Sequence, residues 1–184
     1  MRAAFAAHVD YVQVREKDLP DGALASIVQE LADCPEKQDS RLLVNERWDI
    51  AASCGADGVH LPAGSLPPSM LRSQAGAGMI IGVSCHHRNE VAQAVREGVS
   101  YILLGPIFET LSKPGATPLG LPFLKEVCES CPVPIYALGG IDARHAADCI
   151  QAGAAGVAGI RLFQEAPNLD ALCRRLSLLE KIGD

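Results

Sequence analysis

Short apolar runs alternate with longer amphipathic stretches along almost the whole chain, and this alternation limits the possible folds more than any other feature. The runs cover residues 9–15, 41–45, 58–61, 79–84, 101–106, 134–140 and 156–160. Parallel strands need a crossover of a dozen or more residues between them, usually a helix. Strands that alternate with helices in this way predict βα units and an α/β fold with a parallel sheet.

The stretches between the runs carry signals for helix starts and stops. Pro20 suits the first turn of one helix, and Asp142 suits the N-cap position of another. Gly98 and Gly153 each follow a segment of helical periodicity and suit the position just beyond a helix end. These signals place predicted helices in the stretches between the apolar runs.

The βα units favour a closed barrel over an open sheet. No glycine fingerprint of the dinucleotide-binding type follows the first run. The chain begins with helix-like residues 2–8, so the first βα unit has a helix but no strand before it. Its 184 residues also fall below the roughly 200 usual for the barrel. We therefore expect residues 1–184 to form one domain, a (β/α)₈ TIM-type barrel that lacks the first β-strand.

Charge and cysteine usage exclude several classes of partner. The formal net charge of −6 and the pI near 5.3 provide no field to attract nucleic acid. No run of about 18 apolar residues predicts a membrane span, and the N-terminus does not read as a signal peptide. The 7 cysteines have no disulfide-framework spacing, which is typical of the reducing cytoplasm. The "CESC" motif lacks the context of a redox or zinc site, and we expect a structural role for it.

Polar side chains gather where the expected strands end, which is the face that carries active sites in such barrels. These side chains are candidates for binding a substrate. Arg15 and Lys17 could hold an anionic group, and the segment 106–120 could close over the site as a lid. The full set of substrate-binding candidates is Gln13, Arg15, Lys17, Asn45, Ser84, Thr110, Ser112 and Lys113.

The last two strand ends carry glycines that suit a phosphate group. Glycines there expose backbone N–H groups, and a helix that begins nearby adds the positive end of its dipole. Barrels often bind phosphate on the loops after their last two strands. Tight turns between strand and helix also need glycine, so the pattern has a purely structural explanation as well. The phosphate-binding candidates are Gly139, Gly140, Gly159 and Ile160.

Five motifs in the same order resemble the thiamine phosphate synthase/TenI family: "VQVREKD", "VNERWDIAASCGADGVHL", "GPIFETLSK", "ALGGI" and "AGAAGVAGI". The resemblance covers residues 9 to about 163. It implies a (β/α)₈ barrel with a site for thiazole phosphate or thiamine phosphate at the carboxyl ends of its strands. It also implies an enzyme of thiamine biosynthesis.

The family has a synthase branch and a tautomerase branch, TenI, and the residues at the implied metal-ligand positions distinguish the two in this sequence. The synthase reaction displaces pyrophosphate, which needs Mg²⁺ held by oxygen ligands. The resemblance implies an Asn-Asp pair and a further aspartate after a Gly-Gln pair. This chain has Asn45–Glu46 at the first place and "HLPAGSLP" at the second, where Ser65 brings no charge. Asp18 or Asp49 could compensate, and Glu46 would be the metal ligand if the synthase assignment holds.

The tautomerase branch needs no metal, and we take it as the main hypothesis. The resemblance implies that it aromatises a carboxythiazole phosphate by moving a ring proton, with a histidine two residues after a strand-ending serine. In "GVSCHH" this histidine is His86. Imidazole suits the task because its ordinary pKa, about 6.5, allows it to accept and return a proton near neutrality. We expect solvated roles for His8, His87 and His145. His60 ends a strand and could line the pocket, although a structural role is favoured for it.

Three functions remain open from the sequence. The first is a thiazole tautomerase with no cofactor, and the second is an Mg²⁺-dependent thiamine phosphate synthase. The third is a non-catalytic protein that binds a phosphate ester such as thiamine phosphate. In each case the ligand is a small thiazole phosphate or thiamine phosphate, and a homodimer is possible.

Overall fold

The computed structural model describes residues 1–75 and 78–180, and its core is a seven-stranded parallel sheet in the order β1-β2-β3-β4-β5-β6-β7. Every run predicted to be a strand coincides with one, and only β4 extends beyond its run, by one residue at Cys85. The strands are β1 Tyr11–Val14, β2 Arg41–Asn45, β3 Gly58–Leu61, β4 Ile80–Cys85, β5 Tyr101–Leu104, β6 Ile135–Leu138 and β7 Gly156–Ala158. The predicted α/β class and parallel sheet are therefore confirmed.

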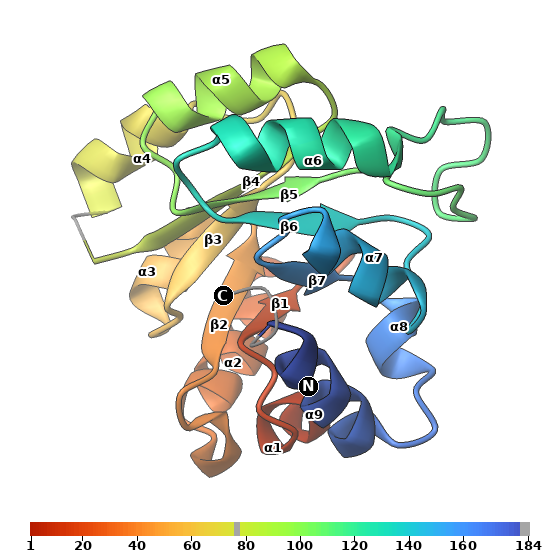
Figure 1. Ribbon diagram of the computed structural model, residues 1–184. Coiled ribbons are helices and arrows are strands. Elements are labelled where there is room, and N and C mark those ends of the chain that lie inside the picture. Colours follow the sequence, from red (N-terminus) through yellow and green to blue (C-terminus); the bar gives the residue numbers. More distant parts are fainter. Residues whose placement is uncertain (76–77, 181–184) are drawn as a thin grey trace.

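Helices connect the strands and lie outside the curled sheet, as Figure 1 shows. The elements are α1 Arg2–Ala6, α2 Asp21–Ala32, the 3₁₀ turn η1 Pro35–Lys37, α3 Trp48–Ser53, α4 Pro68–Ala75, α5 Arg88–Arg96, α6 Gly120–Ser130, α7 His145–Gln151, α8 Arg161–Gln164 and α9 Leu169–Glu180. Across residues 1–75 and 78–180, no helix combines the length and the apolar character needed to cross a membrane.

Helix ends follow the predicted signals closely. Gly98 and Gly153 have φ values of 75° and 94° just beyond α5 and α7, as a residue in the left-handed region after a helix requires. Asp142 lies two residues before the N-cap of α7, which is Arg144, but its carboxylate still accepts hydrogen bonds from the backbone N–H groups of Arg144 and His145 at 2.8 and 2.9 Å. The start of α2 also differs from the prediction, because Pro20 precedes α2 as its N-cap instead of lying in its first turn.

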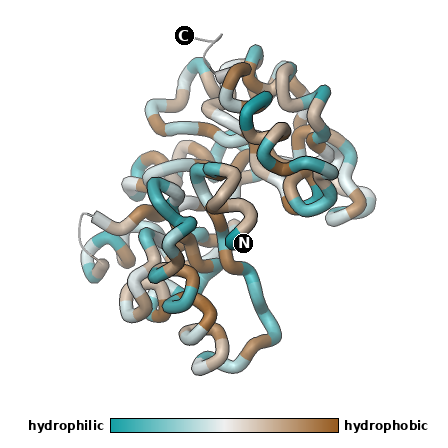
Figure 2. The backbone as a smooth tube through the Cα atoms, turned by 90° about the horizontal axis from the view of Figure 1, so that it is seen from below, coloured by the Kyte–Doolittle hydropathy of each residue, from teal (hydrophilic) through white to brown (hydrophobic). Residues whose placement is uncertain are grey.

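The two faces of the curled sheet differ in burial. The outward face packs against the helices, and its apolar side chains form the core: Val12, Val14, Leu42, Val44, Val59, Leu61, Ile81, Ile102, Leu104, Ile135 and Ala137, all buried. Side chains of the inward face are often only half-buried, such as Gln13 and Asn45. Along the tube in Figure 2, brown and teal stretches alternate, as buried strands and amphipathic helices require.

The sheet stops short of a closed barrel. Within the described residues each strand pairs with its neighbour in sequence, and β7 is not hydrogen-bonded to β1. Helices α1 and α9 contact each other beside this opening (Figure 1). The fold is thus a curled, TIM-like half-barrel, which agrees with the prediction that one strand is missing.

Three tyrosines fill part of the barrel interior. The rings of Tyr11 and Tyr101 stack with centroids 5.2 Å apart, and the edge of Tyr136 contacts both at 5.7 Å. A glycine makes this possible, because a Cβ at Gly82 would lie 2.0 Å from the Cζ atom of Tyr101. The aromatic layer therefore depends on the absence of a side chain on β4.

Candidate active site

His86 follows the end of β4, and its ring is held at both nitrogens. Its Nδ1 lies within hydrogen-bond distance of the Gly105 carbonyl oxygen, just beyond β5. Its Nε2 lies 3.2 Å from the Nζ of Lys113. A carbonyl oxygen can only accept, so Nδ1 carries the hydrogen, and Nε2 of the neutral ring has the lone pair that Lys113 faces. The side chain is half-buried, and the residue lies just beyond the carboxyl end of β4.

Lys113 belongs to the segment 105–119, which joins β5 to α6 and extends away from the body of the molecule in Figure 1. The predicted candidates Thr110 and Ser112 lie on the same segment. The Thr110 hydroxyl accepts a hydrogen bond from the Ser112 N–H at 3.3 Å, and the Thr110 carbonyl accepts one from the Lys113 N–H. This turn directs Lys113 back to His86, while Thr110 and Ser112 have no recorded side-chain contact with the other candidates among the described residues.

Gln13, Asn45 and Glu46 form a chain across the ends of β1 and β2. The Gln13 amide donates to Asn45 Oδ1 at 3.2 Å, and the Asn45 amide donates to Glu46 Oε2 at 3.0 Å. The backbone N–H of Glu46 also donates to the carbonyl of His60, so the turn after β2 is tied to β3. Glu46 has a φ of 60°, in the left-handed region that few residues other than glycine adopt. The structure thus groups three of the sequence candidates.

Ser84 lies one residue before the end of β4 and contacts a buried histidine. The His60 Nε2 lies 2.8 Å from the Ser84 Oγ, and the His60 Nδ1 lies 2.8 Å from the Tyr101 hydroxyl. Burial, aided by the charge of Arg15, lowers the pKa of His60 to about 4. His60 is therefore neutral near pH 7. We expected a structural role for this residue and missed both its contact with Ser84 and the part of Tyr101.

Arg15 and Lys17 lie just beyond β1 and are exposed, as expected for side chains that meet an anion from solvent. Arg15 is close enough to His60 for its charge to affect that ring. Both cations therefore stand at the same end of the sheet as Gln13, but neither has a recorded hydrogen bond with the other candidates among the described residues.

The glycine turns after β6 and β7 offer backbone donors. Within the described residues, no acceptor is recorded for the N–H groups of Gly139, Gly140, Gly159 and Ile160. Helix dipoles contribute less than expected, since α8 has only 4 residues and α7 begins at His145, well after Gly140. The turn after β6 also has a packing role, because a Cβ at Gly140 would lie 2.2 Å from the Glu109 carbonyl oxygen.

The segment 105–109 links the histidine to the glycine turns. The Gly105 carbonyl accepts from His86, and the Phe108 N–H donates to the Gly139 carbonyl at 3.1 Å. The Phe108 ring also stacks on His145, with ring centroids 4.1 Å apart. One stretch of backbone therefore positions both the imidazole and the proposed phosphate turn.

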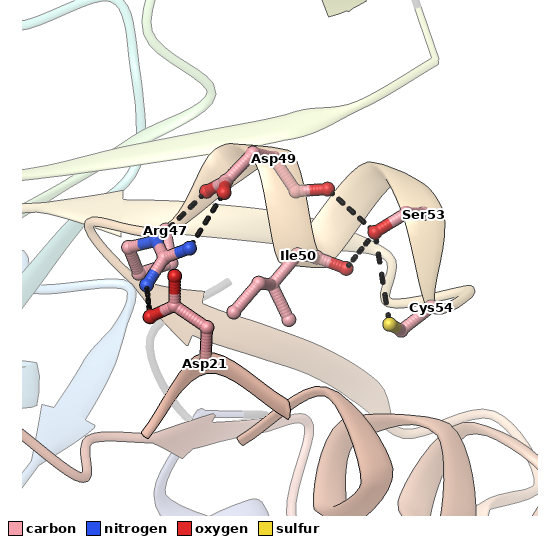
Figure 3. Close-up of polar contacts among 6 residues, drawn as sticks. All are labelled: Asp21, Arg47, Asp49, Ile50, Ser53 and Cys54. Carbon is pink, nitrogen blue, oxygen red and sulfur yellow. Dashed lines mark hydrogen bonds and ion pairs between the residues drawn. The ribbon is translucent and has the colours of Figure 1, made fainter. Parts of the chain in front are cut away.

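The carboxylates at this end of the sheet do not form the Mg²⁺ site that the synthase pattern implies. Asp49 cannot compensate, because both its oxygens bind Arg47 at 2.9 and 2.7 Å, and Arg47 also pairs with Asp21 (Figure 3). Glu46 is the one carboxylate directly after β2, and Ser65 stands where a further carboxylate is implied. No group of three or more potential metal ligands occurs within the described residues. Asp18, the other carboxylate that could compensate, is exposed beyond the end of β1. At the two positions that the resemblance implies, only Glu46 is a carboxylate, so the donor set there does not fit the implied pair.

His87 and the two cysteines of the "CESC" motif, Cys128 and Cys131, have contacts that are structural. His87 is the N-cap of α5, and its side chain accepts from the Glu90 N–H. Cys128 and Cys131 are free thiols that pack against the apolar core around β5 and β6. Burial raises the pKa of the Cys128 thiol to about 11, so little reactive thiolate forms near neutrality.

Known proteins resemble the chain over most of its length. A family model described as thiamine monophosphate synthase matches residues 1–163. "Putative thiamine-phosphate synthase 2" of Aquifex aeolicus is 45% identical over 157 residues, which cover 85% of this chain and 84% of that protein. "Putative thiamine-phosphate synthase" of Geobacter sulfurreducens is 38% identical over 180 residues, covering 97% and 84% of the two chains.

Solved structures agree with these relatives. Thiamine phosphate pyrophosphorylase from Pyrococcus furiosus superposes with a TM-score of 0.87 and 26% identity, covering 99% of this chain and 88% of that one. A 3-hexulose-6-phosphate synthase, at 17% identity and a TM-score of 0.70, shares the fold alone. The names of the relatives favour the synthase over the tautomerase and do not single out the TenI branch. The chain belongs to the thiamine monophosphate synthase/TenI family of thiamine-biosynthesis enzymes.

Proposed function

We propose that this protein is a thiazole tautomerase that aromatises a carboxythiazole phosphate, with His86 as its acid–base group. The observation that carries the proposal is the orientation of the His86 ring. The Gly105 carbonyl holds Nδ1–H, so the lone pair is on Nε2, which faces Lys113 on the segment that follows β5. A base fixed in one tautomer is prepared to take a proton without first reorganising.

The chemistry needs only one proton and no redox partner. Nε2 takes a proton from a saturated carbon of the substrate ring, and the C–H electron pair moves into the conjugated system. The resulting imidazolium returns the same proton at the other end of that system, and the aromatic ring is complete. Lys113, 3.2 Å from Nε2 in the free protein, is free to turn to the anionic substrate and expose the lone pair.

The phosphate is proposed to lie on the turns after β6 and β7. Support comes from the N–H groups of Gly139, Gly140, Gly159 and Ile160, for which no acceptor is recorded within the described residues. Arg15, Lys17 and Lys113 would hold the carboxylate, and Gln13, Asn45 and Ser84 would contact the ring or its substituents. Thr110 and Ser112 would close over the ligand with the segment that carries Lys113.

Thiamine phosphate synthase is the second candidate, and the names of the relatives support it. This reaction would join a thiazole phosphate to a pyrimidine diphosphate and release pyrophosphate. The same phosphate turns and cations would serve it. The donor set around Glu46 does not match the implied metal site, and for this reason we place the synthase second.

The two activities separate in one set of assays. Conversion of the carboxythiazole phosphate is followed by NMR without Mg²⁺, using the unmodified protein, His86→Asn and His87→Asn. We expect fast conversion that is lost in His86→Asn and kept in His87→Asn, since asparagine is a good N-cap and preserves the start of α5. Equal loss in both variants would point to damage of the turn after β4 and not to a chemical role of His86.

A parallel assay supplies thiazole phosphate, the pyrimidine diphosphate and Mg²⁺. Formation of thiamine phosphate, with no conversion in the metal-free assay, would replace the tautomerase by the synthase. Binding of thiamine phosphate without turnover in either assay would leave the third function considered from the sequence, a non-catalytic binding protein.

A further inference from the structure

A row of three residues crosses the barrel interior below the candidate site. The strand register pairs His60 of β3 with Gly82 of β4, and Gly82 with Tyr101 of β5. Because Gly82 has no side chain, the Tyr101 ring passes over β4 and its hydroxyl reaches His60 Nδ1 at 2.8 Å. Two strands that are not neighbours are thereby joined through side chains.

His60 also contacts Ser84, a substrate-binding candidate nearer the carboxyl end of β4. Its Nε2 meets the hydroxyl of Ser84, which lies two residues beyond Gly82 on the same face of β4. His86 is a further two residues along. Tyr101, His60 and Ser84 thus form one hydrogen-bonded line, and Ser84 lies two residues before the proposed acid–base residue.

The direction of the hydrogen bonds in this line follows from burial. Tyr101 and His60 are each 3% exposed, so a donor left without an acceptor there would be costly. Within the described residues, the one recorded polar partner of the Tyr101 hydroxyl is His60 Nδ1. If the Tyr101 hydroxyl donates to Nδ1, the neutral ring carries its hydrogen on Nε2 and donates to Ser84 Oγ. If Nδ1–H instead donated to the Tyr101 oxygen, the hydrogen of the Tyr101 hydroxyl would have no acceptor among these residues.

We propose that Tyr101 and His60 are positioning residues that make the Ser84 hydroxyl a hydrogen-bond donor towards the anionic group of the bound ligand. The Ser84 oxygen already accepts from His60, so its own hydrogen is left to point at the ligand. The low pKa of His60 supports the single-proton ring that this arrangement needs. The inference rests on the proposed function only for the identity of the ligand, a thiazole phosphate bearing carboxylate and phosphate oxygens.

The tautomer can be measured without any ligand. A long-range ¹H–¹⁵N correlation spectrum distinguishes an Nε2–H ring from an Nδ1–H ring, and comparison with His60→Gln assigns the signal among the 5 histidines. We expect His60 as the neutral Nε2–H tautomer at pH 7. An Nδ1–H ring or a charged ring would overturn the proposal, whatever reaction the protein catalyses.

The effect on the ligand is measured by a double-mutant cycle with thiazole phosphate in titration calorimetry. Ser84→Ala should weaken binding about tenfold, as loss of a hydrogen bond to a charged group does. Tyr101→Phe keeps the ring stack and should weaken binding several-fold in the unmodified background. In the Ser84→Ala background it should change binding less than about twofold, because Tyr101 acts through Ser84.

Tyr11→Phe is the matched control, because it removes a hydroxyl from the ring stacked on Tyr101. It should leave binding unchanged. Equal effects of Tyr101→Phe in both backgrounds would mean that Tyr101 only packs the interior, and the proposal would fail. If the unmodified protein does not bind thiazole phosphate, the proposed function fails instead, and the His60 spectrum alone decides the inference.

Discussion

The imidazole Nε2 of His86 lies 3.2 Å from the ammonium group of Lys113, although the two residues are separated by 27 positions in the sequence. One follows β4, and the other lies on the segment between β5 and α6. Both groups are accessible, so the contact can open when an anion arrives. We therefore interpret Lys113 as a cation that exchanges the imidazole for the substrate.

This interpretation predicts a change in substrate affinity. Lys113→Met should raise KM for the thiazole phosphate substrate about tenfold, with a smaller change in kcat, because the lost interaction is a charge-assisted hydrogen bond to the bound anion. Steady-state kinetics measures both constants. Lys125→Met, on α6 and facing Glu129, is the control and should change neither. A collapse of kcat at constant KM would contradict this role.

The aromatic layer of Tyr11, Tyr101 and Tyr136 predicts that a side chain added at Gly82 on β4 strongly lowers the stability of the protein. Gly82→Ala places a Cβ 2.0 Å from the Tyr101 Cζ, and the ring is held by its stack on Tyr11. We expect a loss of about 3 kcal/mol in the free energy of unfolding, as for overpacked cores. Urea unfolding measures it. Gly22→Ala in α2, where a Cβ meets nothing within 4 Å, should be neutral or stabilising. Equal stability of the two variants would show that the ring moves freely.

The buried imidazole of His60 predicts a loss of stability in acid. Its pKa falls from 6.5 to about 4 on folding, chiefly through burial. Between these values the unfolded chain binds more protons than the native protein, so the free energy of unfolding decreases as the pH falls from 6.5 towards 4. The contribution is complete above pH 6.5 and amounts to up to about 3 kcal/mol.

His60→Gln isolates this contribution. Unfolding of both proteins is followed from pH 7 to pH 4, and the difference between their stabilities should shrink over that range because glutamine does not titrate. A difference that stays constant with pH would mean that His60 has an ordinary pKa in the folded protein.

The glycine turn after β6 predicts a packing constraint beside the proposed phosphate site. Gly140→Ala brings a Cβ to 2.2 Å from the Glu109 carbonyl, whereas Gly115→Ala meets nothing within 4 Å. Both glycines have positive φ, 66° and 80°, so both variants share the backbone strain. We expect Gly140→Ala to be less stable than Gly115→Ala by about 2 kcal/mol in urea unfolding. A smaller gap would mean that the segment 105–109 yields easily.

The seven strands, the C-terminal ends of α5 and α7, and the lack of a strand ahead of β1 within the part of the chain that the structure describes could all be predicted from the sequence. These features are local, because strand and helix periodicity and a glycine such as Gly98 act within a few residues. The positions of the strand ends also predicted that polar residues such as Gln13, Asn45 and Ser84 lie at one edge of the sheet, because the carboxyl ends of all strands in a parallel sheet face the same way.

Only the tertiary structure decided which of these side chains meet. The ion pair between Arg47 and Asp21, which lie 26 positions apart, depends on how α2 and α3 pack against each other. The reach of Tyr101 to His60 depends on strand register and on the gap at Gly82, which no local pattern marks. The physical reason is that such contacts arise from the paths of segments far apart in the chain, whereas periodicity records only what neighbouring residues bury.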